Sequence, residues 1–294
     1  NTRIPDASFL SGQVGGEASK TAQGGSNFTV FGNVNVPLGQ GAAALRAAVF
    51  HAKDGGFTDA TGPGGGKDVN SGTVSGGRLS LGLRPAKGVE VRLSAQTQET
   101  EFDGLGVASV DGSGKPVAGE LTQANLRYAQ PSRQRANLAA LNVEFDLGFA
   151  KASSITGHQT QRSASASDLN DGYLLIFPPF LGITNIDMSD QTRLDKTTQE
   201  FRLVSAPGGS IEWLAGAFFS REKTDGGTLW KPTLSPTSIF PPGIPLLDNA
   251  GIETRWKETS FYGTVVWNAS PALALTAGAR ASRNTLDLAT RNAG

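Results

Sequence analysis

The sequence has no cysteine, two histidines and a formal net charge of zero over its 294 residues. The lack of cysteine excludes disulfide cross-links and thiolate chemistry. The balanced charge provides no field that would draw the chain to nucleic acid. A membrane-spanning helix needs an apolar run of ~20 residues, and the longest apolar stretch, 173–183, is interrupted by Pro178 and Pro179. Disulfide scaffolds, nucleic-acid-binding proteins and helical membrane proteins are therefore excluded.

Catalytic motifs are missing as well. His51 and His158 stand far apart, each inside a strand-like pattern, where a histidine is more often a solvated side chain than a base or a metal ligand. Around Lys67 the glycine spacing does not fit a phosphate-binding loop, because Thr61 and Asp68 occupy positions that require Gly and Ser or Thr. The sequence therefore predicts no enzyme, no cofactor and no metal site.

Alternation of apolar and polar residues is the signal that recurs along the chain. Such a period of two is typical of a β-strand with one apolar face. The pattern is clear in the segments 28–38, 79–84, 89–96, 141–147 and 273–281. Helical spacing with caps and a glycine stop is missing. The chain is predicted to be all-β.

Tight turns alternate with long irregular segments. Turn sequences lie near Gly39, Ala86, Gly148, Gly208 and Ser270. The long segments lie at about 54–75, 101–132, 164–194 and 223–256, and two strand-like stretches separate each turn from the next. Transmembrane β-barrels have this asymmetry, with short periplasmic turns and long extracellular loops, whereas compact soluble domains rarely contain several such loops. We expect an antiparallel transmembrane β-barrel fragment of about eleven strands, with a soluble β-sandwich as the alternative.

Aromatic residues gather beside the tight turns. Phe145 and Phe149 flank Gly148, Trp213 follows Gly208, and Trp267 precedes Ser270. Aromatics at one end of the strands are typical of the interfacial girdle of a membrane barrel. Packing in a soluble core would explain them equally well.

Several strings of residues resemble the barrel region of TonB-dependent outer-membrane receptors. Their order along the chain matches that family. They are Asn33-Val34-Asn35-Val36-Pro37-Leu38 with Ala44-Leu45-Arg46, then Asp54-Gly55-Gly56-Phe57-Thr58-Asp59, Thr198-Gln199-Glu200-Phe201-Arg202-Leu203, Trp213 to Phe219, Phe261-Tyr262-Gly263, and Leu275 to Arg280.

The resemblance implies a partial barrel. Residues 1–10 look like the junction after the family's N-terminal plug, and 11–294 like the first half of the barrel domain, without the plug and the C-terminal strands. The chain begins at Asn1 with neither Met nor a signal peptide, which predicts either a processed product or a piece of a longer protein, and we favour the piece. If the whole barrel has 22 strands, this piece is expected to be an open sheet with two unpaired edges.

The resemblance also implies location, partners and function. The protein is expected in the bacterial outer membrane, in contact with its lipid, its own plug and, through the plug's N-terminal box, the TonB complex. Its function would be energised uptake of a scarce nutrient such as a ferric siderophore, cobalamin or an oligosaccharide. The alternatives are a passive porin-like channel and a soluble β-rich adhesin or carbohydrate-binding module.

Charged residues on the polar side of the strands are candidate lumen-facing groups, because arginine at the lipid midplane costs ~2–4 kcal/mol. The resemblance implies that Glu200 and Arg202 face the plug, where they would hold it by hydrogen bonds; simple solvation in a wet interior is the other interpretation. The full set is Arg46, Arg78, Glu90, Arg92, Glu144, Glu200 and Arg202.

Two apolar, proline-rich stretches lie in the long segments, at 173–181 and 239–245. Apolar residues in external loops either pack on one another or contact a ligand. The candidate ligand contacts are Tyr173, Phe177, Phe180, Trp230 and Phe240.

Overall fold

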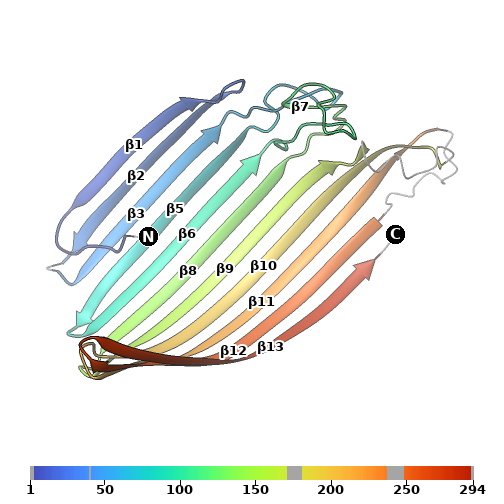
Figure 1. Ribbon diagram of the computed structural model, residues 1–294. Helices are drawn as coiled ribbons and strands as arrows, with labels where there is room; N and C mark the ends of the chain where they lie inside the picture. Colours follow the sequence, from blue (N-terminus) through green and yellow to red (C-terminus); the bar gives the residue numbers. More distant parts are fainter. Residues whose placement is uncertain (1–2, 40, 171–180, 237–247, 293–294) are drawn as a thin grey trace.

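The computed structural model describes residues 3–39, 41–170, 181–236 and 248–292. Eleven strands form one antiparallel sheet, in which each strand pairs with its neighbours in the sequence (Figure 1). They are β1 (Ser11–Lys20), β2 (Ser26–Leu38), β3 (Ala43–Asp54), β5 (Gly72–Ala86), β6 (Val89–Phe102), β8 (Ser132–Asp146), β9 (Ala150–Asp168), β10 (Ile183–Ser205), β11 (Ile211–Leu234), β12 (Asp248–Ser270) and β13 (Leu273–Asn292).

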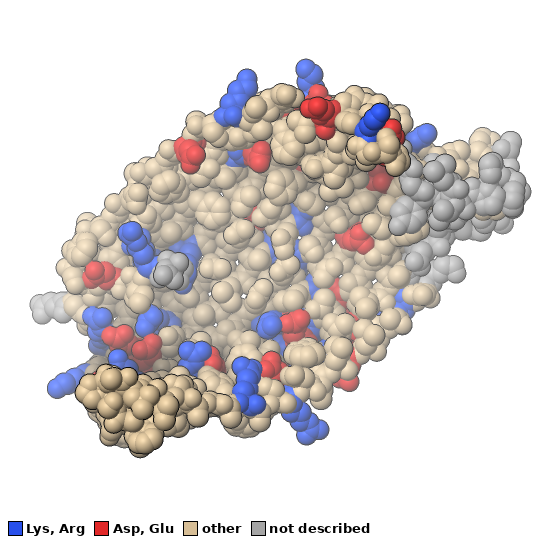
Figure 2. Space-filling view, viewed as in Figure 1, with Lys and Arg blue, Asp and Glu red and all other residues tan. Residues whose placement is uncertain are grey.

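The sheet is a single curved layer, hollowed on the face seen in Figures 1 and 2. It is open, because β1 and β13 each pair with only one strand. Within the described ranges no second sheet packs against either face; the only other sheet is the short pair β4 (Asp59–Ala60) and β7 (Thr122–Gln123). The prediction of about eleven strands in an open antiparallel sheet is therefore confirmed, and the sandwich alternative is wrong.

The predicted tight turns join successive strands at one end of the sheet, here called the turn end. Gly148 and Gly208 have φ angles of 83° and 88°, in the left-handed region that favours glycine. The opposite end, from which the long connections leave, is called the loop end.

The strands near the C-terminus are longer than the sequence predicted. Irregular segments were expected at 164–194 and 223–256, but β9 continues to Asp168, β10 begins at Ile183, β11 continues to Leu234 and β12 begins at Asp248. The apolar alternation stops earlier because both faces of these strand ends carry polar side chains. Backbone pairing between the strands continues beyond the apolar alternation, so the alternation alone predicted these strand boundaries wrongly.

The connections 55–71 and 103–131 fold together at the loop end. Ala60 and Leu126 lie buried between them, with Leu126 only 4% exposed. The side-chain oxygen of Asn70 accepts hydrogen bonds from the backbone N–H groups of Phe57 (2.8 Å) and Thr58 (2.7 Å). This contact region is one of the few places in the described chain with a buried interior. No described segment forms a helix long and apolar enough to cross a membrane.

Candidate functional site: the concave face

The two faces of the sheet differ in chemistry, and the strand register assigns each residue to one of them. Directly paired residues share a face, and residues two apart along a strand share it as well. On this basis every charged candidate from the sequence lies on the concave face: Arg46, Arg78, Glu90, Arg92, Glu144, Glu200 and Arg202. Figure 2 shows basic and acidic side chains spread over this hollowed face.

The convex face carries the apolar half of the alternation. On β12, Phe261, Val265 and Trp267 point outward and are 59%, 47% and 52% exposed. So many exposed large apolar residues in a continuous band are typical of a surface that contacts lipid. On β12 the outward positions from Phe261 to Trp267 carry no polar side chain, and this stretch fits within the ~9–11 tilted residues of a membrane-crossing strand.

Both tryptophans beside the turn end belong to this convex band. Trp213 pairs directly with Val265, and Trp267 pairs with Ile211, so both share the outward face. A core position within the described sheet is excluded for Trp267, which is half exposed. The girdle interpretation therefore fits the structure better than core packing.

The charged candidates near the turn end form ion pairs. Arg92 contacts Glu144 at 2.9 Å and Glu90 at 3.9 Å. Glu90 also contacts Arg84 at 3.2 Å. Further along the strands, Arg46 donates to Asn33 (2.6 Å).

A larger network crosses four strands, from β10 to β13. Arg202 donates to Glu200 (2.9 Å) and to the hydroxyl oxygen of Tyr262 (3.2 Å). The Tyr262 hydroxyl in turn donates to Glu200. Arg280 lies over the Tyr262 ring, 5.9 Å from its centroid, and its guanidinium donates to Glu258 (2.7 Å). The network therefore holds two carboxylates and two guanidinium groups on one patch of the concave face.

Gly216 is the residue that allows this network to form. It lies on β11, between Arg202 on β10 and Tyr262 on β12. A Cβ atom at this position would be 2.3 Å from Cζ of Tyr262. Tyr262 therefore reaches across β11 to Glu200 only because residue 216 has no side chain.

The sequence pointed to Glu200 and Arg202 but missed Tyr262, Arg280 and Gly216. Tyr262 and Arg280 were noted only as members of strand patterns. The alternation does place Tyr262 and Arg280 on the polar face, because each follows or precedes an apolar residue, Phe261 or Ala281. Their meeting with Glu200 depends on the pairing of four strands, which the alternation does not specify.

The segment before β1 lies on the concave face, over β2 and β5. The buried side chain of Asn35 holds it, because its amide donates to the carbonyl oxygens of Asp6 (2.8 Å) and Phe9 (3.0 Å). The same side chain accepts from the Asp6 backbone N–H (2.8 Å). The Ser8 backbone N–H donates to the Asp6 carboxylate and lowers the pKa of that group. Residues 6–9 are thus fixed inside the curve of the sheet.

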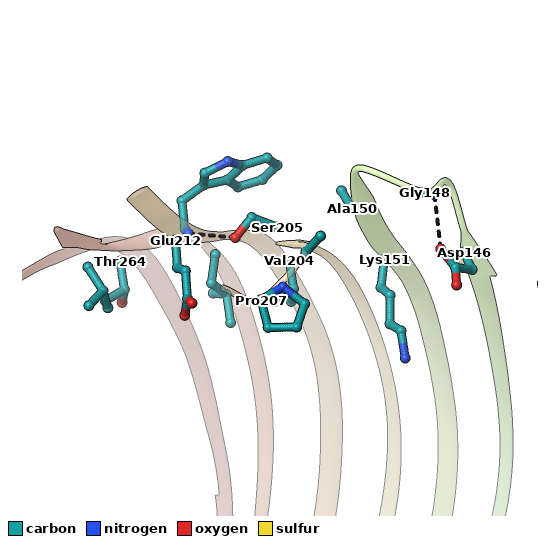
Figure 3. Close-up of a pocket in the computed structure, with 13 residues that line it drawn as sticks. Asp146, Gly148, Ala150, Lys151, Val204, Ser205, Pro207, Glu212 and Thr264 are labelled. Carbon is teal, nitrogen blue, oxygen red and sulfur yellow. Dashed lines mark hydrogen bonds between the residues drawn. The ribbon is translucent and has the colours of Figure 1, made fainter. Parts of the chain in front are cut away.

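A hollow of about 650 Å³ lies at the turn end of the concave face. Figure 3 shows Asp146, Lys151 and Glu212 extending from the same side of the sheet around it. Val204, Pro207 and Thr264 complete much of its wall. Two of its acidic residues also support turns, since Asp146 accepts from the Gly148 N–H (2.9 Å) and Glu212 from the Gly208 N–H (2.7 Å).

Most candidate ligand contacts at the loop end fall outside the described residues: Tyr173, Phe177, Phe180 and Phe240. Trp230 is described, and its register with Met188 places it on the concave side of β11. Near it, the Tyr128 hydroxyl and the Thr233 hydroxyl are 3.0 Å apart, which ties the connection 103–131 to the end of β11. Among the described residues, no group of three or more His, Asp or Glu side chains could hold a metal ion.

The sequence matches no family model and no curated protein. Solved structures match it over almost its whole length. The ferric yersiniabactin uptake receptor FyuA from Yersinia pestis matches over 99% of this chain, with a TM-score of 0.75 and 15% identity. The ferric citrate transporter FecA, in its unliganded form, matches over 99% with a TM-score of 0.65 and 13% identity.

The siderophore receptor PiuA from Acinetobacter baumannii matches over 98%, with a TM-score of 0.57 and 15% identity. The chain has the fold of an outer-membrane receptor barrel. The predicted fold and the resemblance to such receptors are confirmed. The match covers 44% of FyuA, 42% of FecA and 47% of PiuA, so the chain spans less than half the length of these receptors.

Proposed function

We propose that this chain is part of the wall of an outer-membrane receptor for energised uptake of a scarce nutrient. The observation that carries the proposal is the pairing of the receptor-barrel fold with a lipid-type convex face and a charged concave face. A barrel closed by further strands would keep the apolar band in lipid and enclose the charged face in water.

We further propose that residues 1–10 connect a plug domain to the barrel and that 11–294 belong to the barrel. The position of residues 3–10 on the concave face supports this, because a domain preceding them would enter the lumen directly. Energy would come from the TonB complex through that plug, so the protein is proposed to act without a cofactor and not as an enzyme.

The substrate is proposed to be a ferric siderophore, because FyuA is a ferric yersiniabactin uptake receptor and PiuA a siderophore receptor. Cobalamin and oligosaccharides are the other candidates. Cells lacking the gene, with and without the full-length gene restored, would be tested for uptake of iron-55 carried by a panel of siderophores. We expect uptake of at least one complex only in the restored cells, and its loss when an uncoupler removes the proton gradient.

A passive porin-like channel gives a different result. Uptake would then survive the uncoupler, and the purified full-length protein would conduct ions steadily in a planar bilayer. Failure to accumulate any iron complex, cobalamin or oligosaccharide would contradict the receptor proposal. A full-length protein that stays soluble without detergent would instead favour an adhesin or carbohydrate-binding module.

The network around Glu200 and Arg202 is proposed to hold the plug. Its groups are only partly exposed in the open sheet, and Arg202 and Glu200 lie on the face that would surround the plug. In the full-length protein, Arg202→Glu is expected to impair uptake while leaving membrane insertion intact. Lys87→Glu, at an exposed turn, makes the same charge change away from the concave network and serves as the control. Normal uptake by Arg202→Glu would refute the role of this network.

A further inference from the structure

The convex face has a basic feature that the uptake proposal does not use. Arg135 on β8, Arg162 on β9 and Arg193 on β10 are paired directly across neighbouring strands. We call these residues the arginine row. All are exposed on the outward face. Like charges placed directly opposite one another destabilise a sheet, and an anion bound at Arg162 and its two arginine partners would relieve this repulsion.

Glu99 is paired across the sheet with Arg135, and Asp225 with Arg193, but neither carboxylate forms an ion pair with the row. The flanking carboxylates are bound elsewhere, since Glu99 contacts Arg133 and Asp225 contacts Lys223 at 3.1 Å. Asp195 faces outward nearby and lies 3.9 Å from His158. Among the described residues, no carboxylate oxygen lies within 4.0 Å of a guanidinium nitrogen of the row.

A groove of about 570 Å³ lies on the same face, toward the turn end from the row. Small residues form its floor, namely Ala47, Gly77, Ala95 and Ala139, and Val49 and Leu79 line it as well. Polar residues line it too, among them Thr97, Asn137, His158 and Thr160. The separation between Ala139 and Arg135 on β8 is about four residues, or roughly 13 Å along the strand. The groove thus belongs to the apolar band, and the row lies beyond the edge of that band.

Polar side chains form the end of the groove nearest the row. Thr97 donates to Asn137 (2.8 Å), whose amide donates to Thr160 (3.2 Å). The order along the strands is therefore apolar groove, uncharged polar ladder, then cations. A lipid has the same order in its acyl chains, its ester-linked backbone and its phosphate.

We infer that the groove and the arginine row bind a phosphate-bearing lipid of the surrounding leaflet. The acyl chains occupy the groove, and the guanidinium groups bind the phosphate, for which their planar, two-pronged donors are well suited. This inference rests on the proposed membrane location but not on uptake, the plug or TonB.

Lipid retention by the purified full-length protein tests the inference. Native mass spectrometry would compare dioleoyl phosphatidic acid with dioleoylglycerol, which has the same chains and no phosphate. The wild type is expected to retain the phosphatidic acid in preference. The variant Arg135→Gln/Arg162→Gln/Arg193→Gln is expected to bind it at least about tenfold more weakly, while retaining dioleoylglycerol as the wild type does.

The matched control is Lys67→Gln/Lys87→Gln/Lys115→Gln, which removes the same charge from exposed loops and turns. It is expected to bind like the wild type. Arg221 and Lys257, also outward-facing, stay unchanged in all variants, so any binding they support sets a common background. Equal phosphatidic acid binding by the row variant and the wild type would overturn the inference, and so would equal retention of both lipids by the wild type.

Two further variants distinguish a loss of lipid binding from a loss of folding. Arg162→Gln removes only the middle cation and is expected to weaken retention while melting at the same temperature or higher, since it relieves repulsion. Ala139→Phe fills the groove and is expected to weaken binding of dioleoyl but not of dihexanoyl phosphatidic acid. Equal weakening of dioleoyl and dihexanoyl phosphatidic acid binding by Ala139→Phe would overturn the inference that the groove holds the acyl chains. Because no assay uses a transported nutrient, failed uptake with normal lipid retention would refute the proposed function alone.

Discussion

The phenol ring of Tyr262 lies over Gly216, where any other residue would place its Cβ atom. Through this contact a residue of β12 reaches Glu200 and Arg202 on β10, across the strand between them. The concave network therefore depends on the absence of a side chain at position 216.

Gly216→Ala is expected to displace Tyr262 and separate it from Glu200. Forcing extra volume into a packed position typically costs ~1–3 kcal/mol, so the full-length protein should unfold at a lower temperature in detergent. Gly32→Ala is the control, because the nearest atom to an added Cβ there is the Gln13 carbonyl oxygen at 3.8 Å. A Gly216→Ala protein as stable as the control would show that Tyr262 moves aside without cost.

Asn35→Asp is expected to release the segment before β1. The substitution removes the amide donors to Asp6 and Phe9 while keeping the shape of the side chain. A buried group left without its partner costs ~1–3 kcal/mol. In the full-length protein, amides of residues 6–10 should exchange with solvent faster than in the wild type. Asn284→Asp, at an exposed position on β13, should leave that exchange unchanged.

Tryptophan fluorescence should distinguish the two faces of the sheet. Trp267 lies on the convex face, and Trp256, paired with Glu222, lies on the concave face of the same strand. In variants that keep only one tryptophan, lipids brominated on their acyl chains should quench Trp267 strongly and Trp256 little. Equal quenching would contradict the assignment of the convex face to lipid.

Asp168→Ala is expected to loosen the connection 103–131. One carboxylate oxygen of Asp168 accepts hydrogen bonds from the backbone N–H groups of Arg127 (2.6 Å) and Tyr128 (3.2 Å). Without it, trypsin should cleave after Arg127 faster in intact cells that display the full-length protein. Asp287→Ala removes an exposed carboxylate on β13 and should leave the cleavage rate as in the wild type.

The sequence was most informative where one face meets an apolar environment. Leu79 to Leu83 and Val89 to Ala95 alternate because one side chain in two faces outward, and this pattern located the strands and their faces. Glycines in the turns located the sharp reversals, since Gly148 and Gly208 adopt conformations that other residues disfavour.

The same reasoning failed where both faces meet water. At the loop end of β10 and β11, polar residues such as Gln191 and Asp225 follow no period, yet backbone hydrogen bonds extend the strands through them. The network at Tyr262 could not be predicted from the sequence for another reason. It joins residues about sixty positions apart, and its geometry depends on the exact register of β10, β11 and β12.

The strands differ in length around the sheet, from 10 residues in β1 to 24 in β11. A membrane crossing needs only ~9–11 residues, so the long strands β9 to β12 extend beyond it at the loop end as continuous backbone-paired sheet. On the other side, above β3 to β8, the strands are followed by folded connections that depend on a few side chains such as Asn70 and Asp168. Opening free energies are lowest where such contacts are few. Local opening at the loop end is therefore expected first on this second side, above β3 to β8.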